Sequence, residues 1–336
     1  MKVAFLANSF HLKTTKSSDF FIDLLRRAFD DVHVIPFKEA WSIIPKSKWD
    51  LLVVWMDLME PKELEALGVP RVVLVPMFDN SPHEREFWIR YSRFKILSFS
   101  TTFLDELRGW GLDAFGVQYY PAPDSDAPLG SPGLRGFFWP RTAYVGWSVI
   151  KTLIGSTKFE SLQLHVPVEL NPELTDLPTR EDEKIFPIAK SSWYKSKTEY
   201  GEAVRNANIY FAPRRTEGIG MSFLEAMSWG LCVVAPDAPT MSEYIENGVN
   251  GILYDLNNPF PVDFSRYRDL GTAARESCLL GRVKWESSFG SIKTFLETRP
   301  SGSVLTAHPV VRARKRGYAF LRRIYRILKR MLSQLS

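Results

Sequence analysis

Two glutamates frame a short glycine turn in the second half of the chain. Glu217 stands directly before Gly218-Ile219-Gly220, and Glu225 follows eight residues after Glu217. The apolar spacing predicts a helix from about Met221 to Trp229. At about 3.6 residues per turn, Glu225 lies near enough to the helix start to point beside the glycine turn. Both carboxylates are therefore expected to face one ligand.

The glycine turn and the helix start suit an anionic ligand. Glycine lets the backbone approach a ligand closely, because no side chain intervenes. The first turn of a helix offers unpaired N–H groups and the positive end of the helix dipole, which stabilise an anion such as a diphosphate. A nucleotide sugar has hydroxyl groups at both ends and a diphosphate between them, so it matches this arrangement.

A βαβ unit is predicted to position these groups. Apolar runs predict strands on both sides of the helix, and Gly230 stands where a helix C-cap belongs. The expected strands cover residues 209–212, 231–235 and 252–254.

The pattern E-G-x-G, followed by E-A-M and G-x-x-V-V-A-P, resembles the signature of glycosyltransferase family 4, whose members have the GT-B fold. The resemblance implies that Glu217 contacts the donor sugar and that Glu225 holds the ribose hydroxyls. It also implies that the backbone from Gly218 to Ser222 meets the sugar and the phosphates. Glu243 falls where the family often has a second acidic residue at the donor.

Two other interpretations of the unit remain open. Ser222-x-x-Glu225 has the spelling of a capping box, which would make Glu225 a helix-start residue but would not explain Glu217. A dinucleotide-binding turn is the second, since Asp237 ends the next strand as a ribose-binding acid should. Against it, Phe223 replaces the third glycine and the loop before the turn is long.

Strands and helices alternate through the first part of the chain, which predicts a parallel, doubly wound sheet. Together with the resemblance, this predicts an α/β protein of the GT-B type: two doubly wound Rossmann-like domains facing a cleft, plus a basic amphipathic C-terminal helix. The expected division is an N-terminal acceptor-side domain (1–125), a linker (126–140), a nucleotide-sugar-binding domain (141–280), a crossover helix (281–300), and a linker with a basic tail (301–336).

Ligands bind such sheets at the carboxyl ends of the strands. In the loop after the expected strand RVVLVPM, Ser81 and Glu84 predict a capping box that places His83 in the first helical turn, with Asp79 just ahead of it. The resemblance implies that Asp79 or His83 faces a sugar, whereas a solvated helix start is the alternative. The loop NSFHLKTTKSS lacks the glycines usual in the family, and its lysines are expected to neutralise phosphate instead.

The resemblance also implies an arginine and a lysine that clamp the leaving diphosphate. Arg141 is the first choice for the arginine, and Lys151 follows later than the family pattern expects. Lys190, Lys195 and Lys197 are alternatives to Lys151.

The charge of the chain is concentrated at its C-terminal end. Nine basic and no acidic residues lie between 301 and 336, so the other 34 basic and 38 acidic residues leave the body at −4. A mildly acidic body argues against a nucleic-acid-binding core. Aliphatic residues recur at helical spacing, so 312–335 is expected to lie on an anionic membrane surface. Packing on the protein itself or on a partner, and binding of nucleic acid by the arginines, are the alternatives.

Other features narrow the setting and the chemistry. Cys232 and Cys278 form neither a disulfide framework nor a metal-site spacing. The start MKVAFLANSF resembles a strand rather than a signal peptide, and no apolar run is long enough to span a bilayer. Asp124-Ser125-Asp126 has the spelling of a metal-binding D-x-D, but its proline-rich surroundings favour a turn. A cytoplasmic protein, peripheral on the inner face of the membrane, is expected.

The predicted function is that of a retaining glycosyltransferase of polysaccharide biosynthesis, using a nucleotide-sugar donor and a glycan or lipid-linked acceptor. Neither a cofactor nor a metal is expected, because fixed N–H groups and Arg141 would stabilise the leaving diphosphate. The alternative is a catalytically inactive GT-B-like protein that binds a nucleotide sugar or a glycan. The glycine-free first loop and the late Lys151 favour that alternative.

Overall fold

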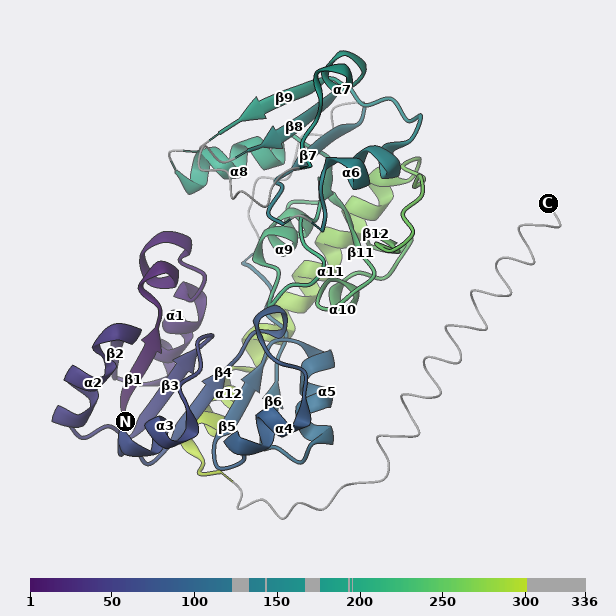
Figure 1. Cartoon of the computed structure of the whole chain (residues 1–336). Coiled ribbons are helices and arrows are strands. Elements are labelled where there is room, and N and C mark those ends of the chain that lie inside the picture. The colour runs from purple at the N-terminus through teal and green to yellow at the C-terminus, as the bar shows by residue number, and fades with distance from the viewer. Residues whose placement is uncertain (123–132, 143, 167–175, 193, 195, 301–336) are drawn as a thin grey trace.

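The computed structural model describes residues 1–300, except 123–132, 143, 167–175, 193 and 195. Its architecture is two α/β domains joined by a long helix, each built on a six-stranded sheet (Figure 1). The predicted fold class is thereby confirmed for this part of the chain. The expected tail helix, Asp124-Ser125-Asp126 and Lys195 lie outside the described residues.

The N-terminal sheet has the strand order β2-β1-β3-β4-β5-β6, with every neighbouring pair parallel. Its central strands are buried on both faces, which explains their continuous apolar runs. The strands are β1 (Lys2–Ala7), β2 (Asp31–Pro36), β3 (Leu51–Trp55), β4 (Val72–Val75), β5 (Lys95–Ser98) and β6 (Ala114–Gly116). The helices and helical turns are η1 (His11–Thr15), α1 (Asp19–Ala28), η2 (Phe37–Glu39), α2 (Ala40–Ile43), η3 (Ile44–Lys46), α3 (Pro61–Ala66), η4 (Phe78–Asn80), α4 (Arg85–Trp88), η5 (Ile89–Tyr91) and α5 (Thr101–Gly109).

The C-terminal sheet has the order β12-β11-β10-β7-β8-β9 and is also parallel throughout. Its strands are β7 (Arg135–Phe138), β8 (Ser161–His165), β9 (Ile188–Ser191), β10 (Ile209–Phe211), β11 (Cys232–Pro236) and β12 (Ile252–Tyr254). Its helices are α6 (Trp147–Ile154), α7 (Arg180–Ile185), α8 (Lys197–Arg205), α9 (Met221–Ser228) and α10 (Met241–Tyr244). β7 begins inside the range assigned to the linker, so the linker prediction of 126–140 was too long. The run Gly136–Phe138 is a buried strand of the sheet. Its apolar stretch is short, so the sequence alone did not distinguish this strand from a hinge.

Two further helices return the chain to the first domain. α11 (Tyr267–Ser287) packs on α9 and β11, and α12 (Phe289–Glu297) lies beside the N-terminal sheet (Figure 1). The rings of Phe295 and Phe115 stack with centroids 5.2 Å apart, and Arg71 Nε donates to the Glu297 carbonyl at 2.8 Å. The expected crossover at 281–300 therefore corresponds to the end of α11 and to α12.

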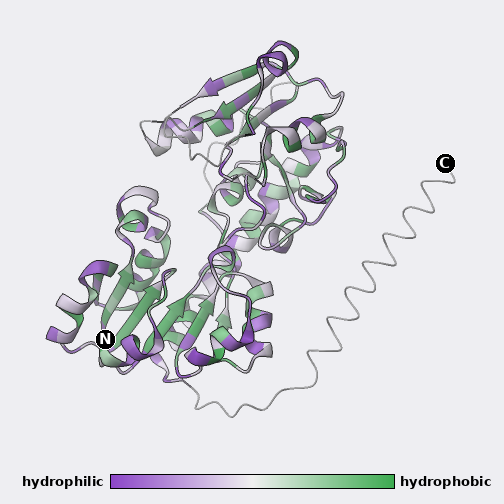
Figure 2. Ribbon diagram, in the orientation of Figure 1, coloured by the Kyte–Doolittle hydropathy of each residue, from purple (hydrophilic) through white to green (hydrophobic). Residues whose placement is uncertain are grey.

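The apolar interior continues from one domain into the other. The central strands of the N-terminal sheet are strongly hydrophobic, whereas the edge strand β9 of the C-terminal sheet contains hydrophilic residues (Figure 2). One buried cluster contains residues of the first domain, such as Phe5 and Trp55, together with Phe223 and Val233 of the second. The domains are thus held together by a shared core as well as by chain connectivity. Within the described residues, none of the helices combines the length and the hydrophobicity needed to cross a bilayer.

Candidate functional site

The strand order of the second domain identifies where a ligand would bind. From β7 the chain proceeds to β8 and β9 on one side of the sheet and then to β10, β11 and β12 on the other. The order therefore reverses between β7 and β10, and ligands of open parallel sheets bind at the carboxyl ends of the strands at such a point. Arg141 follows β7 and Glu217 follows β10, so the topology brings these two predicted residues to one place.

The glycine turn is the start of α9. Gly220 has φ of 80°, a left-handed conformation that favours glycine, and it is the N-cap of the helix. The helix begins at Met221 without a side-chain cap, so Ser222 already lies inside its first turn. The capping-box interpretation is therefore wrong. The backbone N–H groups at the start of α9 remain without a side-chain acceptor at the N-cap, as the anion-binding prediction requires.

Gly218 brings the other domain onto this turn. A Cβ atom at position 218 would lie 2.8 Å from Met77 Cβ and 2.9 Å from Asp79 Oδ1, so the absence of a side chain permits the contact. Met77 and Asp79 belong to the segment after β4, in the N-terminal domain. We call this region, where residues 77–79 meet residues 214–218, the domain junction.

Arg214 connects the acidic groups of the domain junction. Its Nη1 atom lies 3.1 Å from Asp79 Oδ2, and its Nε atom lies 3.9 Å from Glu217 Oε1. The carboxyl side chains of Asp79 and Glu217 are only 17% and 14% exposed, so water screens their charges poorly. Sequence reasoning placed Asp79 and Glu217 in the site separately but missed Arg214.

Burial changes the acidity of both carboxyl groups. Removal from water raises the pKa of Glu217 to about 7; Arg214 and Arg141 oppose this rise, and the Asp79 carboxylate adds to it. Burial also raises the pKa of Asp79, against the influence of Arg214. Among the described residues, the Glu217 carboxylate accepts no hydrogen bond, so its charge depends on the two arginines. An acidic group with a pKa near neutrality is typical of a functional site.

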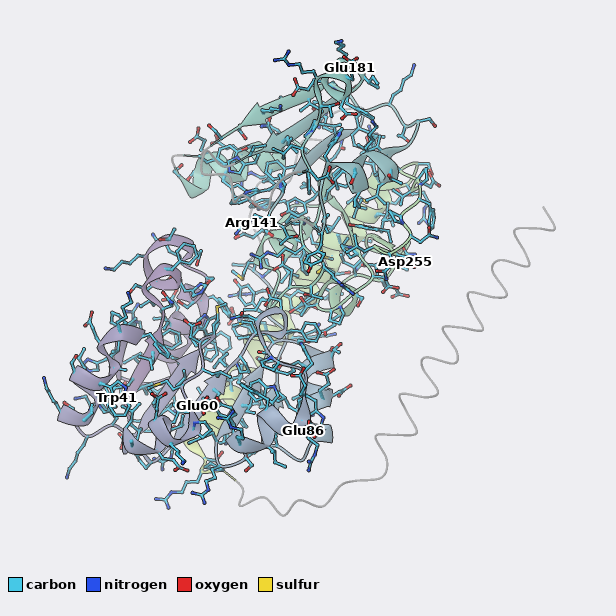
Figure 3. All side chains as sticks on the ribbon, viewed as in Figure 1. Trp41, Glu60, Glu86, Arg141, Glu181 and Asp255 are labelled. Atoms are coloured by element: carbon cyan, nitrogen blue, oxygen red, sulfur yellow. The ribbon has the colours of Figure 1, made fainter. Side chains whose placement is uncertain are left out.

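Arg141 lies on the side of its domain nearest to the N-terminal domain (Figure 3). Its guanidinium carbon is 4.3 Å from the centroid of the Trp139 ring, a cation–π contact that holds the side chain. Burial and the charge of Arg214 lower the pKa of Arg141, and Glu217 opposes this. The guanidinium nevertheless stays cationic, because arginine ordinarily titrates far above neutral pH. Arg141 and Glu217 thus influence each other's ionisation as opposite charges.

Glu225 lies on α9 and acts electrostatically on two tyrosines. Burial raises the pKa of Tyr119 to about 12, with Glu225 adding to the rise. Burial also raises the pKa of Tyr200 well above its ordinary value, again with a contribution from Glu225. The charge of Glu225 is therefore felt both by Tyr200 of α8 and by Tyr119 of the segment after β6. Its predicted contact with ribose hydroxyls stays a prediction.

Glu243 is used in a way that the sequence did not indicate. Its Oε1 accepts hydrogen bonds from Ser100 Oγ (2.7 Å) and Thr102 N (3.0 Å), and its Oε2 accepts one from Thr101 N (2.7 Å). Ser100 is the N-cap of α5, and its Oγ also accepts from Phe103 N. A carboxylate of the second domain thus caps a helix of the first, which suits the positive end of the helix dipole.

His83 is not in a helical turn, which corrects the prediction. Residues 81–84 are non-helical, and α4 begins only at Arg85. The Pro82 carbonyl accepts a hydrogen bond from the side chain of Trp88, Nε1, at 2.7 Å. His83 Nδ1 lies 2.7 Å from Glu106 Oε2, and its Nε2 lies 2.9 Å from the Phe78 carbonyl. Both ring nitrogens are therefore engaged inside the N-terminal domain.

Lys151 is likewise engaged elsewhere. Its Nζ atom lies 2.6 Å from Asp182 Oδ1, in an ion pair between α6 and α7. Lys190 forms an ion pair with Glu183, so neither lysine has a described contact with Glu217 or Arg141. Lys13 and Lys16 of the first loop are exposed, and their predicted role toward phosphate stays a prediction. No three His, Cys, Asp or Glu side chains gather into a metal-binding group in the part of the chain that the structure describes.

An aromatic group beside Arg141 also escaped sequence reasoning. The His165 ring stacks on Tyr194 with centroids 4.4 Å apart and meets Trp139 edge-on at 4.7 Å. Burial, with the charge of Arg141, lowers the pKa of His165 to about 4, so this ring is neutral at pH 7. No sequence spacing connects these residues, because they come from different strands and loops.

Comparison with known proteins supports the location of this site. The family model described as "Glycosyl transferases group 1" matches residues 189–260, which include the glycine turn and both framing glutamates. A search of curated protein sequences finds no significant match to the chain.

Several solved structures share the fold over most of the chain. The HepE protein of Anabaena, crystallised with UDP and glucose, has a TM-score of 0.58 at 13% identity, covering 87% of this chain and 100% of its own. A sucrose-phosphate synthase from Thermosynechococcus elongatus has a TM-score of 0.62 at 12% identity, covering 88% and 99%. The lipopolysaccharide outer core galactosyltransferase WaaB has 0.55 at 14% identity, covering 88% and 95%. These similarities establish a GT-B fold.

Proposed function

We propose that this chain transfers a glycosyl group from a nucleotide-diphosphate sugar to a glycan or lipid-linked acceptor, with retention at the anomeric carbon. One observation carries the proposal: a largely buried carboxyl group, Glu217, lies 3.9 Å from Arg214 and is influenced by the charge of Arg141, just ahead of a helix and at the switch point of a parallel sheet. The match to a glycosyltransferase family model over 189–260 supports it, as does the fold shared with HepE, which was crystallised with UDP-glucose.

The reaction needs opposite charges on the two sides of one bond. The bond between the anomeric carbon and the diphosphate oxygen breaks, and the oxygen leaves with the electron pair. The acceptor hydroxyl forms the new glycosidic bond and loses its proton. Positive charge therefore develops on the sugar and negative charge on the diphosphate, and a catalyst must stabilise both.

We assign the anionic residue to the positive charge on the sugar, and the cationic and N–H groups to the negative charge on the diphosphate. Glu217 as a carboxylate stabilises the sugar, whereas Arg141 and the N–H groups from Gly220 to Ser222 stabilise the diphosphate. Glu225 holds the ribose hydroxyls. The flat rings beside Arg141, Trp139 among them, offer stacking surfaces for a nucleobase.

Release of nucleoside diphosphate tests the proposal. The full chain is incubated with UDP-, GDP- and ADP-sugars, and free nucleoside diphosphate is measured together with thermal stabilisation by each donor. We expect turnover with one class of donor, and weaker donor binding in Glu225→Ala. The matched control is Glu202→Gln, a change at an exposed position of α8. Thermal stabilisation without any release would instead identify a catalytically inactive binding protein.

Metal independence forms part of the proposal, because cationic and N–H groups of the chain are assigned to the diphosphate. Turnover is expected to survive EDTA. If EDTA abolishes turnover and manganese restores it, the metal-binding interpretation of Asp124 and Asp126 replaces this part of the proposal.

Peripheral membrane attachment on the cytoplasmic face is proposed from the sequence of the tail alone. Removal of residues 301–336 is expected to abolish sedimentation with anionic vesicles and to leave turnover with a soluble acceptor intact. A full-length protein that ignores anionic vesicles at low salt would overturn this assignment.

A further inference from the structure

Arg214 is the residue through which the two domains meet at the proposed site. Its guanidinium contacts Asp79 of the N-terminal domain and lies near Glu217 of its own loop. The Asp79 side chain also lies against Gly218, where a Cβ atom would lie 2.9 Å from Asp79 Oδ1 and 2.8 Å from Met77 Cβ, so a larger residue would force the junction to shift. The contacts of Asp79 with Arg214 and Gly218 therefore both position the N-terminal domain and form part of the surroundings of Glu217.

The charges that act on Glu217 come from three different segments: Arg214 belongs to its own loop, Arg141 follows β7 and Asp79 approaches from the N-terminal domain. Tyr210 of β10 interacts with Glu217 as well, but burial raises the pKa of Tyr210 to about 12, so this side chain is uncharged. The two arginines favour the ionised form of Glu217, whereas Asp79 disfavours it. Among the described residues, Asp79 and Arg214 form an ion pair across the domain junction, and this pair connects the charge on Glu217 to the approach of the domains.

We propose that Arg214 is a positioning residue for the proposed transfer: it holds the Glu217 carboxylate ionised and ties it to Asp79 of the opposite domain. This inference rests on the proposed function. When the domains are together, Arg214 shares its charge between two acids. When they separate, Asp79 leaves, and Arg214 and Glu217 are exposed to water. Glu217 therefore has its active-site surroundings only while the N-terminal domain is in place.

The pH dependence of kcat/KM for nucleoside diphosphate release tests this proposal with opposite expectations for two variants. Arg214→Gln removes the cation, so the acid limb is expected to move up by about one pH unit. Asp79→Asn keeps a hydrogen-bond acceptor for Arg214 but removes the anion, so the limb is expected to move down. Arg214→Lys should restore most of the wild-type profile. Arg215→Gln, an equal charge change at the exposed neighbouring position, should leave the profile unchanged.

Thermal stability, which does not depend on turnover, distinguishes failure of this inference from failure of the proposed function. Arg214→Gln is expected to lower Tm more at pH 8 than at pH 5, and the difference should shrink in a Glu217→Gln background. If no donor is turned over but this Tm pattern appears, the charge relation stands and the glycosyl-transfer function falls. The proposal is overturned, and Arg214 has only a structural role, in either of two cases. The acid limbs of Arg214→Gln and Asp79→Asn move in the same direction, or the difference between the Tm losses at pH 8 and pH 5 persists in the Glu217→Gln background.

Discussion

Glu217 and Glu243 are two glutamates of the same domain, and both lie where it meets the N-terminal domain, but their surroundings are opposite. Glu243 accepts three hydrogen bonds from the start of α5, whereas Glu217 accepts none from the described residues. A buried charge without hydrogen bonds lowers the stability of the folded state. A buried charge that accepts hydrogen bonds from another element holds the two elements together. The comparison indicates that Glu243 joins the domains, whereas no hydrogen bond from the described residues offsets the cost of burying the charge of Glu217.

The largest effect expected from this contrast concerns turnover. Glu217→Gln keeps the size and hydrogen-bonding capacity of the side chain but removes the charge that we propose stabilises the sugar. We expect kcat to fall by about 100-fold or more, with KM for the donor changed little. Steady-state kinetics over a range of donor concentrations measures both parameters. Equal, mild effects on kcat and KM would mean that Glu217 does not act on the transition state.

The same variant is expected to be more stable than the wild type at alkaline pH. Burial raises the pKa of Glu217 from 4.5 to about 7, so the folded protein binds a proton that the unfolded chain releases between these values. The free energy of unfolding therefore falls as the pH rises from about 4.5 to about 7. Glu217→Gln should remove a penalty of about 3 kcal/mol at pH 8 and very little near pH 4.5. Thermal unfolding at both pH values measures this; an equal Tm difference at the two would contradict it.

Glu243→Ala is expected to destabilise the protein, whereas Glu217→Gln is expected to stabilise it at alkaline pH. It removes three hydrogen bonds to one carboxylate, so the free energy of unfolding should fall by about 1–2 kcal/mol. Denaturant unfolding measures this loss, and donor KM is measured on the same variant. A large rise of KM with unchanged stability would return Glu243 to the donor-binding role that the sequence predicted.

Ser100→Ala should have the smallest effect of the series. Ser100 Oγ accepts from Phe103 N and donates to Glu243, so its loss weakens the cap while the two backbone donors to Glu243 remain. A loss of about 1 kcal/mol in unfolding free energy is expected. Measured in the Glu243→Ala background, the loss should become smaller, because the two residues share a hydrogen bond. Additive losses would show that the two side chains act independently.

Much of the fold was predictable because it follows from local patterns. The buried strands β1, β3 and β4 are continuous apolar runs, and a parallel sheet buries such strands on both faces. The turn Gly218-Ile219-Gly220 and the helix after it were also predicted, since a left-handed glycine at a helix start has a local signal. β6 was not predicted, because its sequence Ala-Phe-Gly lacks the run of aliphatic and aromatic residues that marks the equally short β10 and β12.

The sequence by itself determined the strand–helix alternation and the position of Glu217 at a helix start, whereas Arg141 was chosen through the family resemblance and the strand before it, β7, was assigned to the linker. Tertiary structure alone decided that Asp79, rather than His83, reaches the glycine turn, and that Glu243 caps α5. It also decided that Arg214, an unremarked arginine beside a predicted residue, contacts both domains. The physical reason is distance along the chain. Backbone propensity is set by neighbours in sequence, whereas the pKa of a carboxyl group is set by whichever distant charges packing brings next to it.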